Sequence, residues 1–168
     1  MALWGGDDDS SFAYAINDSG QVAGSSATAN SGSHHAFITG PDGKGMTDLG
    51  TLSGSYSSAS GINDAGQVVG DSATKDGGPY GGDVFRAFIT GPNGVGMIDI
   101  NSYADLPDGY HLRDVNGINN LGQVIGTIYN TPPPIPEPAS YALMLAGLGL
   151  VGFMARGKKP AANTVSRG

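Results

Sequence analysis

Cysteine is absent from the 168-residue sequence, which excludes disulfides, a thiolate nucleophile, cysteine-ligated zinc and iron–sulfur clusters. Basic residues are few: 8 Lys and Arg against 15 Asp and Glu give a formal net charge of −7, which argues against nucleic acid as the main partner. Glutamate occurs once, as Glu137. Glycine is abundant, with 29 residues, but it does not recur at every third position. The composition therefore indicates a turn-rich globular chain and excludes collagen.

The two ends of the chain differ in charge. All acidic residues lie at or before Glu137, where they are accompanied only by the basic residues Lys44, Lys75, Arg86 and Arg113. The other basic residues all follow the last acidic one. This asymmetry indicates an acidic body and a basic tail with separate roles.

One seven-residue phrase occurs three times. It reads Ile-Asn-Asp-Ser-Gly-Gln-Val at 16–22, Ile-Asn-Asp-Ala-Gly-Gln-Val at 62–68 and Ile-Asn-Asn-Leu-Gly-Gln-Val at 118–124. The centre of the phrase contains Asn, Asp and Gly residues that favour a turn, and its Val begins a return strand. Each copy therefore predicts a β-hairpin. Large and small side chains alternate before the first copy, as in a strand. The turn positions that we expect to have a structural role are Asn17, Gly20, Asn63, Gly66, Asn119 and Gly122.

A second phrase lies between the copies of the first. His-Ala-Phe-Ile-Thr-Gly-Pro-Asp-Gly at 35–43 returns as Arg-Ala-Phe-Ile-Thr-Gly-Pro-Asn-Gly at 86–94. Its Gly-Pro turn between alternating residues predicts a second hairpin. Two hairpins give four short strands per unit, in a repeat region at 12–130 whose units start near residues 12, 58 and 114.

Four strands in about 45 residues is the size of one β-propeller blade. Two full units and one further hairpin are too few to close a ring of roughly four to eight blades. The predicted fold class is therefore an all-β repeat body, an incomplete propeller-like array of hairpins, with a sandwich-like packing as the alternative. Residues 1–11 are expected to be a disordered N-terminus.

The repeated phrases resemble the HAF-repeat family of bacterial extracellular proteins. The resemblance rests on His-Ala-Phe at 35–37, a degenerate Arg-Ala-Phe at 86–88, and the segments 45–52 and 61–70. It covers roughly residues 12–130 and implies an exported all-β repeat protein with no established activity.

The C-terminal region has a different composition. Residues 131–138 are rich in proline, which predicts an extended linker. Residues 139–155 are apolar and uncharged, and the membrane-flanking basic residues Arg156, Lys158 and Lys159 follow them. This pattern predicts one C-terminal transmembrane helix, with its basic end in the cytoplasm and the repeat body outside.

Pro136, Glu137 and Pro138, followed by the apolar stretch and the basic cluster, resemble the tripartite PEP-CTERM sorting domain. The resemblance implies that an exosortase-type membrane protease of Gram-negative bacteria reads the Pro-Glu-Pro motif. The precursor would be anchored in the inner membrane by residues 139–159, and the product would reach the cell surface or the extracellular space. Residues 160–168 are expected to be a disordered tail.

An exported body also needs an N-terminal signal. Residues 1–7 have neither a basic start nor an apolar core. We therefore expect the sequence to be N-terminally truncated or its start to be mis-assigned.

No residue pattern predicts an enzyme. Asp18 and Asp64 occupy equivalent repeat positions, as do Asp48 and Asp99, which favours a structural role over a pair of catalytic carboxylates. The repeated aromatic residues at 14, 37 and 88 are expected to belong to the core.

Two adjacent histidines are the main candidates for metal binding. His34 and His35 should point to opposite faces of a strand, which disfavours a shared metal. His111 has no motif around it. We expect neither a metal nor a cofactor.

The sequence thus predicts a non-enzymatic exported protein of the cell envelope or extracellular matrix. Its expected partners are an exosortase, the membrane at least transiently, and extracellular polysaccharide as a further candidate. The alternative is a secreted polysaccharide-active enzyme or a carbohydrate-binding adhesin on a propeller-like scaffold.

Overall fold

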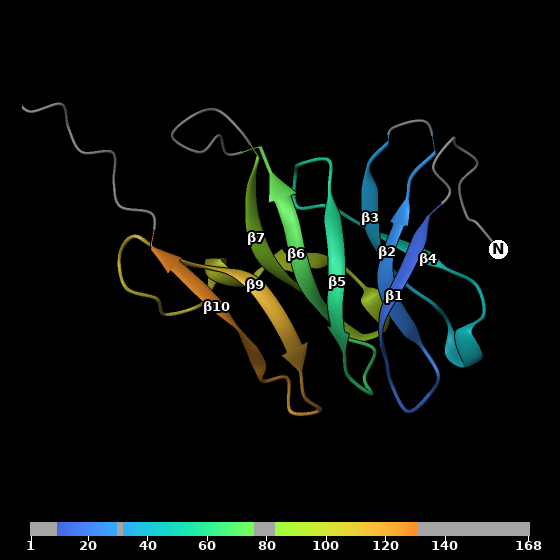
Figure 1. Cartoon of the computed structure of the whole chain (residues 1–168). Helices are drawn as coiled ribbons and strands as arrows, with labels where there is room; N and C mark the ends of the chain where they lie inside the picture. The colour runs from blue at the N-terminus through green and yellow to red at the C-terminus, as the bar shows by residue number, and fades with distance from the viewer. Residues whose placement is uncertain (1–9, 30–31, 76–82, 131–168) are drawn as a thin grey trace, which may run out of the picture. The chain divides into compact units, whose positions relative to one another are not determined.

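Three antiparallel sheets follow one another along the chain in the computed structural model, which describes residues 10–29, 32–75 and 83–130 (Figure 1). The first sheet contains β1 (Ser11–Ile16), β2 (Val22–Ala27), β3 (His34–Ile38) and β4 (Thr47–Gly50) in that order. The second contains β5 (Ser57–Ile62), β6 (Val68–Thr74), β7 (Val84–Thr90) and β8 (Met97–Asp99). The third contains β9 (Tyr110–Ile118) and β10 (Val124–Asn130). All these residues belong to one compact body.

The two sequence phrases form the two kinds of hairpin. The first phrase supplies the turns of β1–β2, β5–β6 and β9–β10, and the second supplies those of β3–β4 and β7–β8. In the second kind, the turn contains a three-residue 3-10 segment, η1 (Pro41–Gly43) or η2 (Pro92–Gly94). A third such segment, η3 (Ile100–Ser102), follows β8. Each complete repeat is therefore one four-stranded antiparallel meander.

The predicted fold class was wrong as a whole, although the β-rich body is consistent with it. The three sheets close no propeller ring, since two meanders and one hairpin provide too few blades. The predicted transmembrane helix has no counterpart: across the described ranges the helical segments are three residues long, and none could cross a bilayer. Residues 139–159, where that helix was expected, lie outside the described residues.

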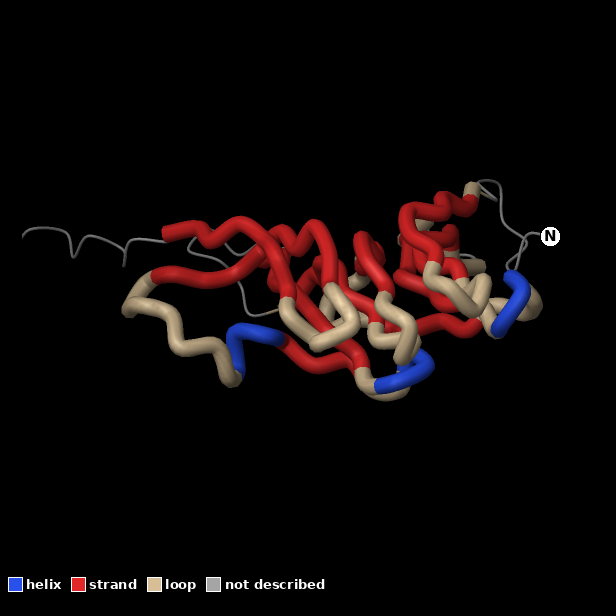
Figure 2. Tube along the Cα trace, turned by 90° about the horizontal axis from the view of Figure 1, so that it is seen from below, coloured by secondary structure: helices blue, strands red, loops and turns tan. Residues whose placement is uncertain are grey.

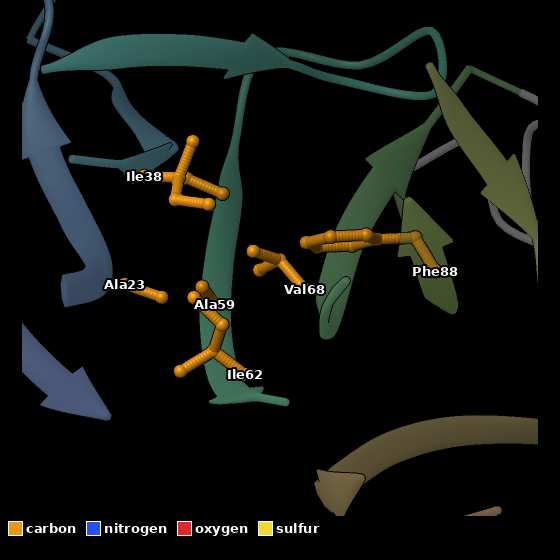
Figure 3. Close-up of a cluster of buried hydrophobic side chains, with 7 residues drawn as sticks. Ala23, Ile38, Ala59, Ile62, Val68 and Phe88 are labelled. Carbon is orange, nitrogen blue, oxygen red and sulfur yellow. The ribbon is translucent and has the colours of Figure 1, made fainter. Parts of the chain in front are cut away.

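The second sheet is packed on both faces. Neighbouring side chains of a strand point to opposite faces, so Val68 faces the first sheet and Val69 faces the third. The first interface consists of Ala23, Ala36, Ile38, Ala59, Ile62, Val68 and Phe88 (Figure 3). The second is built from Val69, Ala87, Ile100 and Val115, with partly buried residues of β9 and β10 around them. The apolar cores therefore lie between sheets, in the manner of stacked repeats.

Hydrogen bonds between equivalent turns join the repeats, and we call the set formed by Asn17, Asn63 and Asn119 the asparagine ladder. The Nδ2 group of Asn17 donates to the backbone oxygen of Asn63 at 3.0 Å, and Nδ2 of Asn63 donates to that of Asn119 at 3.1 Å. The next residue repeats the pattern, because the Asp18 N–H donates to Oδ1 of Asp64 at 3.1 Å. Figure 2 views this end of the sheets, with the turns in tan.

Each ladder asparagine also closes its own turn. Oδ1 of Asn63 accepts the N–H groups of Ala65 and Gln67 at 3.2 and 3.0 Å, and its Nδ2 donates to Oε1 of Gln67 at 2.9 Å. Asn63 is buried, so this amide meets its hydrogen-bonding needs inside the protein. One side-chain type thus fixes both the hairpin and its stacking on the next repeat.

Candidate binding site

A strip of rings and one guanidinium crosses all three sheets, at the end of the strands opposite the asparagine ladder. We call it the aromatic strip. Its members are Phe12, Tyr14, His34, Tyr56, Phe85, Arg113, Tyr129 and His111. Neighbouring ring centroids from Tyr14 to Phe85 are 5.8–6.4 Å apart. Such spacing lets the rings pack edge to face or offset and stabilise one another.

Arg113 links the second sheet to the third. Its guanidinium carbon lies 5.6 Å from the ring centroid of Phe85 on β7 and 5.4 Å from that of Tyr129 on β10. His111 is two residues earlier on β9 and pairs directly with Tyr129 across the sheet, while Arg113 is the extra residue where the register between β9 and β10 shifts. The strand register therefore places one cation between two rings, with an imidazole beside them.

A groove opens beside this end of the strip. Its volume is about 310 Å³, and the residues lining it include Asp83, Phe85, His111, Arg113, Tyr129 and Asn130. Ligand pockets are typically of about this size or larger and combine apolar walls with a few polar groups. This groove has both.

Carboxylates adjust the electrostatics of the groove. The Tyr129 hydroxyl donates to Oδ2 of Asp114 at 2.6 Å, and this bond raises the pKa of Tyr129. Nε of Arg113 lies 3.6 Å from Oδ1 of Asp114. Burial and the nearby cations Arg86 and Arg113 lower the pKa of His111, so its imidazole is neutral near pH 7. Asp71 on β6 interacts with the charges of Asp114 and Arg113. Burial and the Asp114 carboxylate raise the pKa of Asp71, while Arg113 opposes the shift.

The arrangement is suited to a ligand with both apolar and hydroxylated faces. Flat ring faces offer apolar contact, whereas the guanidinium, the neutral imidazole, the amide of Asn130 and the carboxylates offer donors and acceptors in fixed directions. Such a surface fits a sugar ring better than a purely apolar molecule.

None of the turn, sorting and membrane-flanking residues that were identified from the sequence is among the described residues that line this groove. Gly20, Gly66 and Gly122 have positive φ angles in the three hairpin turns, beside the asparagines of the ladder. The sorting residues Pro136, Glu137 and Pro138 lie outside the described residues. The basic residues Arg156, Lys158 and Lys159 do so as well.

The histidines and repeated aspartates are separated. His34 packs between the rings of Phe12 and Tyr56, whereas Nδ1 of His35 lies 3.0 Å from Oδ2 of Asp48 on β4. The equivalent pair in the second repeat is Arg86 and Asp99, at 3.8 Å. No group of three His, Asp or Glu side chains suited to a metal occurs in the part of the chain that the structure describes.

Sequence reasoning was correct for two of the three repeated aromatic residues. Phe37 and Phe88 are buried, but Tyr14 is 56% exposed and belongs to the strip. Five members of the strip were missed: Phe12, Tyr56, Phe85, Arg113 and Tyr129. Only His34 and Phe85 occupy equivalent repeat positions, so the repeat pattern gave no indication of the strip.

Residues 134–159 match the PEP-CTERM protein-sorting motif. The chain carries a PEP-CTERM sorting motif. This confirms the prediction made from the Pro-Glu-Pro motif, the apolar stretch and the basic cluster. A PEP-CTERM motif implies an exported protein that an exosortase sorts and processes. No curated protein and no solved structure gives a significant match to the chain, and the HAF-repeat resemblance stays a prediction.

Proposed function

We propose that this exported PEP-CTERM protein is a non-catalytic component of the cell envelope or extracellular matrix, and that its HAF-type repeat body binds extracellular polysaccharide. The observation that carries the proposal is the groove at the Arg113 end of the aromatic strip. The PEP-CTERM motif supports it, because the motif implies an exported protein, and polysaccharide outside the cell is accessible to such a protein.

The length of the strip favours a polymer over a small molecule. Its members come from β1, β3, β7, β9 and β10, with Tyr56 just before β5, so it offers contacts along three sheets. Phe12 and Tyr14 at its far end are exposed, although large apolar side chains are usually covered in a core. A chain of sugars that starts in the groove could use them as further stacking positions.

Affinity electrophoresis tests the binding. The probes are a neutral polymer (hydroxyethyl cellulose), an acidic polymer (alginate) and the extracellular polysaccharide of an exosortase-bearing host. We expect at least one probe to retard the chain, and Tyr129→Ala and Arg113→Ala to weaken that retardation about tenfold, the effect of roughly 1.4 kcal/mol. Tyr129→Phe keeps the ring and should keep most of the binding.

Tyr103→Ala is the matched control, because Tyr103 is exposed but lies outside the strip. It should bind as the unaltered chain does. Equal retardation of all variants, or no retardation by any probe, contradicts the proposal.

Polysaccharide cleavage is the second candidate function, and the environment of Asp71 favours it. A carboxyl group whose pKa is raised by burial and by a neighbouring carboxylate can act as a general acid. Incubation of the same polymers with the chain, followed by an assay for reducing ends, separates the two candidates. Reducing ends that appear with the unaltered chain and disappear with Asp71→Asn would establish catalysis in place of simple binding.

A further inference from the structure

The asparagine ladder has two ends that the described residues leave unused. At the last turn, Nδ2 of Asn119 donates to Gln123 at 2.7 Å, but among the described residues it finds no backbone acceptor of the kind that Asn17 and Asn63 find in the next repeat. At the first turn, no described asparagine donates to the backbone oxygen of Asn17. One end therefore offers a donor and the other an acceptor for the same bond.

The adjacent backbone groups repeat this complementarity. The N–H of Asp18 donates to Asp64, and that of Asp64 donates to Oδ1 of Asn120 at 3.0 Å. The N–H of Asn120 would be the next donor in this series, and the side chain of Asp18 has no preceding N–H among the described residues. The asparagine bonds and the N–H bonds of the following residues therefore both leave a donor at the last turn and an acceptor at the first turn.

The apolar faces at the two ends are also unpaired. Ile16 is 69% exposed, whereas Ile62, at the same repeat position, is 9% exposed because the first sheet covers it. Ile125 is 68% exposed, whereas its equivalent Val69 is fully buried beneath the third sheet. Each end presents one half of an interface that occurs complete twice inside the body.

The outer face of the third sheet is hollowed where a further repeat would fit. A cavity of about 500 Å³ is lined by Gly117, Ile118, Asn119, Gln123 and Ile125. The equivalent of Gly117 in the second repeat is Gly61, and there the next repeat does approach closely: a Cβ on Gly61 would lie 3.0 Å from Cα of Gly117. The hollow therefore lies at the position that a neighbouring strand occupies inside the body.

We propose that copies of this chain associate head to tail, with the first sheet of one copy stacked on the third sheet of another. Asn119 then donates to the backbone oxygen of Asn17 in the second copy, the N–H of Asn120 donates to its Asp18 carboxylate, and Ile16 covers the hollow beside Ile125. A second copy is the occupant because the contact continues the internal interface in both hydrogen bonding and apolar area. Such a contact is heterologous, so it extends into chains or closes into rings.

Cysteine cross-linking tests the contact, since the natural chain has no cysteine. Proteins that contain all 168 residues and carry either Asp18→Cys or Asn120→Cys are mixed in one detergent buffer and oxidised mildly. We expect the mixed 18–120 disulfide to exceed the 18–18 and 120–120 products at least fivefold. The Asp64→Cys/Asn120→Cys double variant is the positive control, because these positions are hydrogen-bonded within one chain.

Val95→Cys provides the background, because Val95 is highly exposed and lies in the loop before β8, away from both ends. The proposal is overturned if the disulfide between Cys at positions 18 and 120 is no more frequent than the one between Cys at positions 95 and 120. A predominance of 18–18 or 120–120 products also overturns it, because it indicates a two-fold contact.

Sedimentation velocity supplies an independent measurement. The unaltered chain should sediment faster as its concentration rises, and Ile16→Asp or Ile125→Asp should each abolish that dependence. Ile98→Asp, at an exposed position on β8, should leave it unchanged. The same dependence in all four proteins contradicts the proposal, whatever the outcome of polysaccharide binding.

Discussion

At the scale of single residues, equivalent positions preserve an interaction while they change its chemistry. His35 in the first repeat and Arg86 in the second each face an aspartate of the next strand, Asp48 and Asp99. The sequence therefore shows His and Arg as alternatives, because either side chain can face a carboxylate. Repeat comparison identifies the position, but only the structure identifies its partner.

Gly70 on β6 is a residue where we expect the backbone to tolerate little change. A Cβ at this position would lie 2.0 Å from the carbonyl oxygen of Ser58, where a bulge in β5 brings the two strands together. Gly70→Ala should lower the free energy of unfolding by about 3 kcal/mol, because backbone atoms would have to move. Urea denaturation measures the loss. Gly117→Ala is the matched control, since its nearest neighbour, Cγ1 of Ile125, would be 3.8 Å away.

A change of Gly117 to alanine should alter stability by less than about 0.5 kcal/mol. Equal losses for the two glycine variants would show that the close approach at β5 does not limit the fold.

Asp71 should make the stability of the body depend on pH. Its pKa is raised in the folded state, so the folded protein holds this proton more tightly than the unfolded chain does. The resulting stabilisation is present below about pH 4 and is lost as the pH rises through the folded pKa. Asp71→Ser introduces the residue that the first repeat has at the equivalent position, Ser25. This substitution should remove the decrease in the free energy of unfolding as the pH rises.

Urea denaturation across a pH series tests this prediction. The free energy of unfolding of the Ser variant, relative to that of the unaltered chain, should increase from pH 3 to pH 7. A difference that stays constant or falls over that range would exclude Asp71 as its source.

At the scale of elements, the second sheet should be the most stable part of the body. It is covered on both faces, whereas every residue of β10 after Val124 is exposed. Hydrogen exchange followed by mass spectrometry should therefore find the slowest backbone exchange in β6 and β7 and faster exchange in β10. Uniform protection of the three sheets would contradict this order.

The hairpins could be predicted from the sequence because their determinants are local. Asn, Gly and Pro at fixed turn positions, between alternating apolar residues, indicate where each strand ends. The ladder could not be predicted, since Asn63 looks like an ordinary turn residue until its Nδ2 group is seen to reach Asn119. The aromatic strip escaped prediction for a related reason. Its members come from different repeat positions and meet only when the sheets stack.

At the scale of the whole molecule, the body and the sorting motif can be tested separately. Glu137 belongs to the matched PEP-CTERM region, while the groove lies within the repeat body. Glu137→Gln should reduce processing and export of the chain in an exosortase-bearing host at least tenfold, as judged by immunoblots of cell and medium fractions. Purified Glu137→Gln protein should still bind the polysaccharide probe.

The nearby substitution Ser140→Ala is the control, because it leaves the Pro-Glu-Pro motif intact. Normal processing of the Glu137→Gln chain would separate sorting from this motif.

The contact between the first and second sheets recurs between the second and third. A whole repeat can therefore be inserted or deleted without the evolution of a new packing surface. Tandem duplication within the gene could therefore lengthen or shorten the protein while preserving every junction. Among related bacteria, we expect the length of the repeat body to vary chiefly by gain and loss of whole repeats.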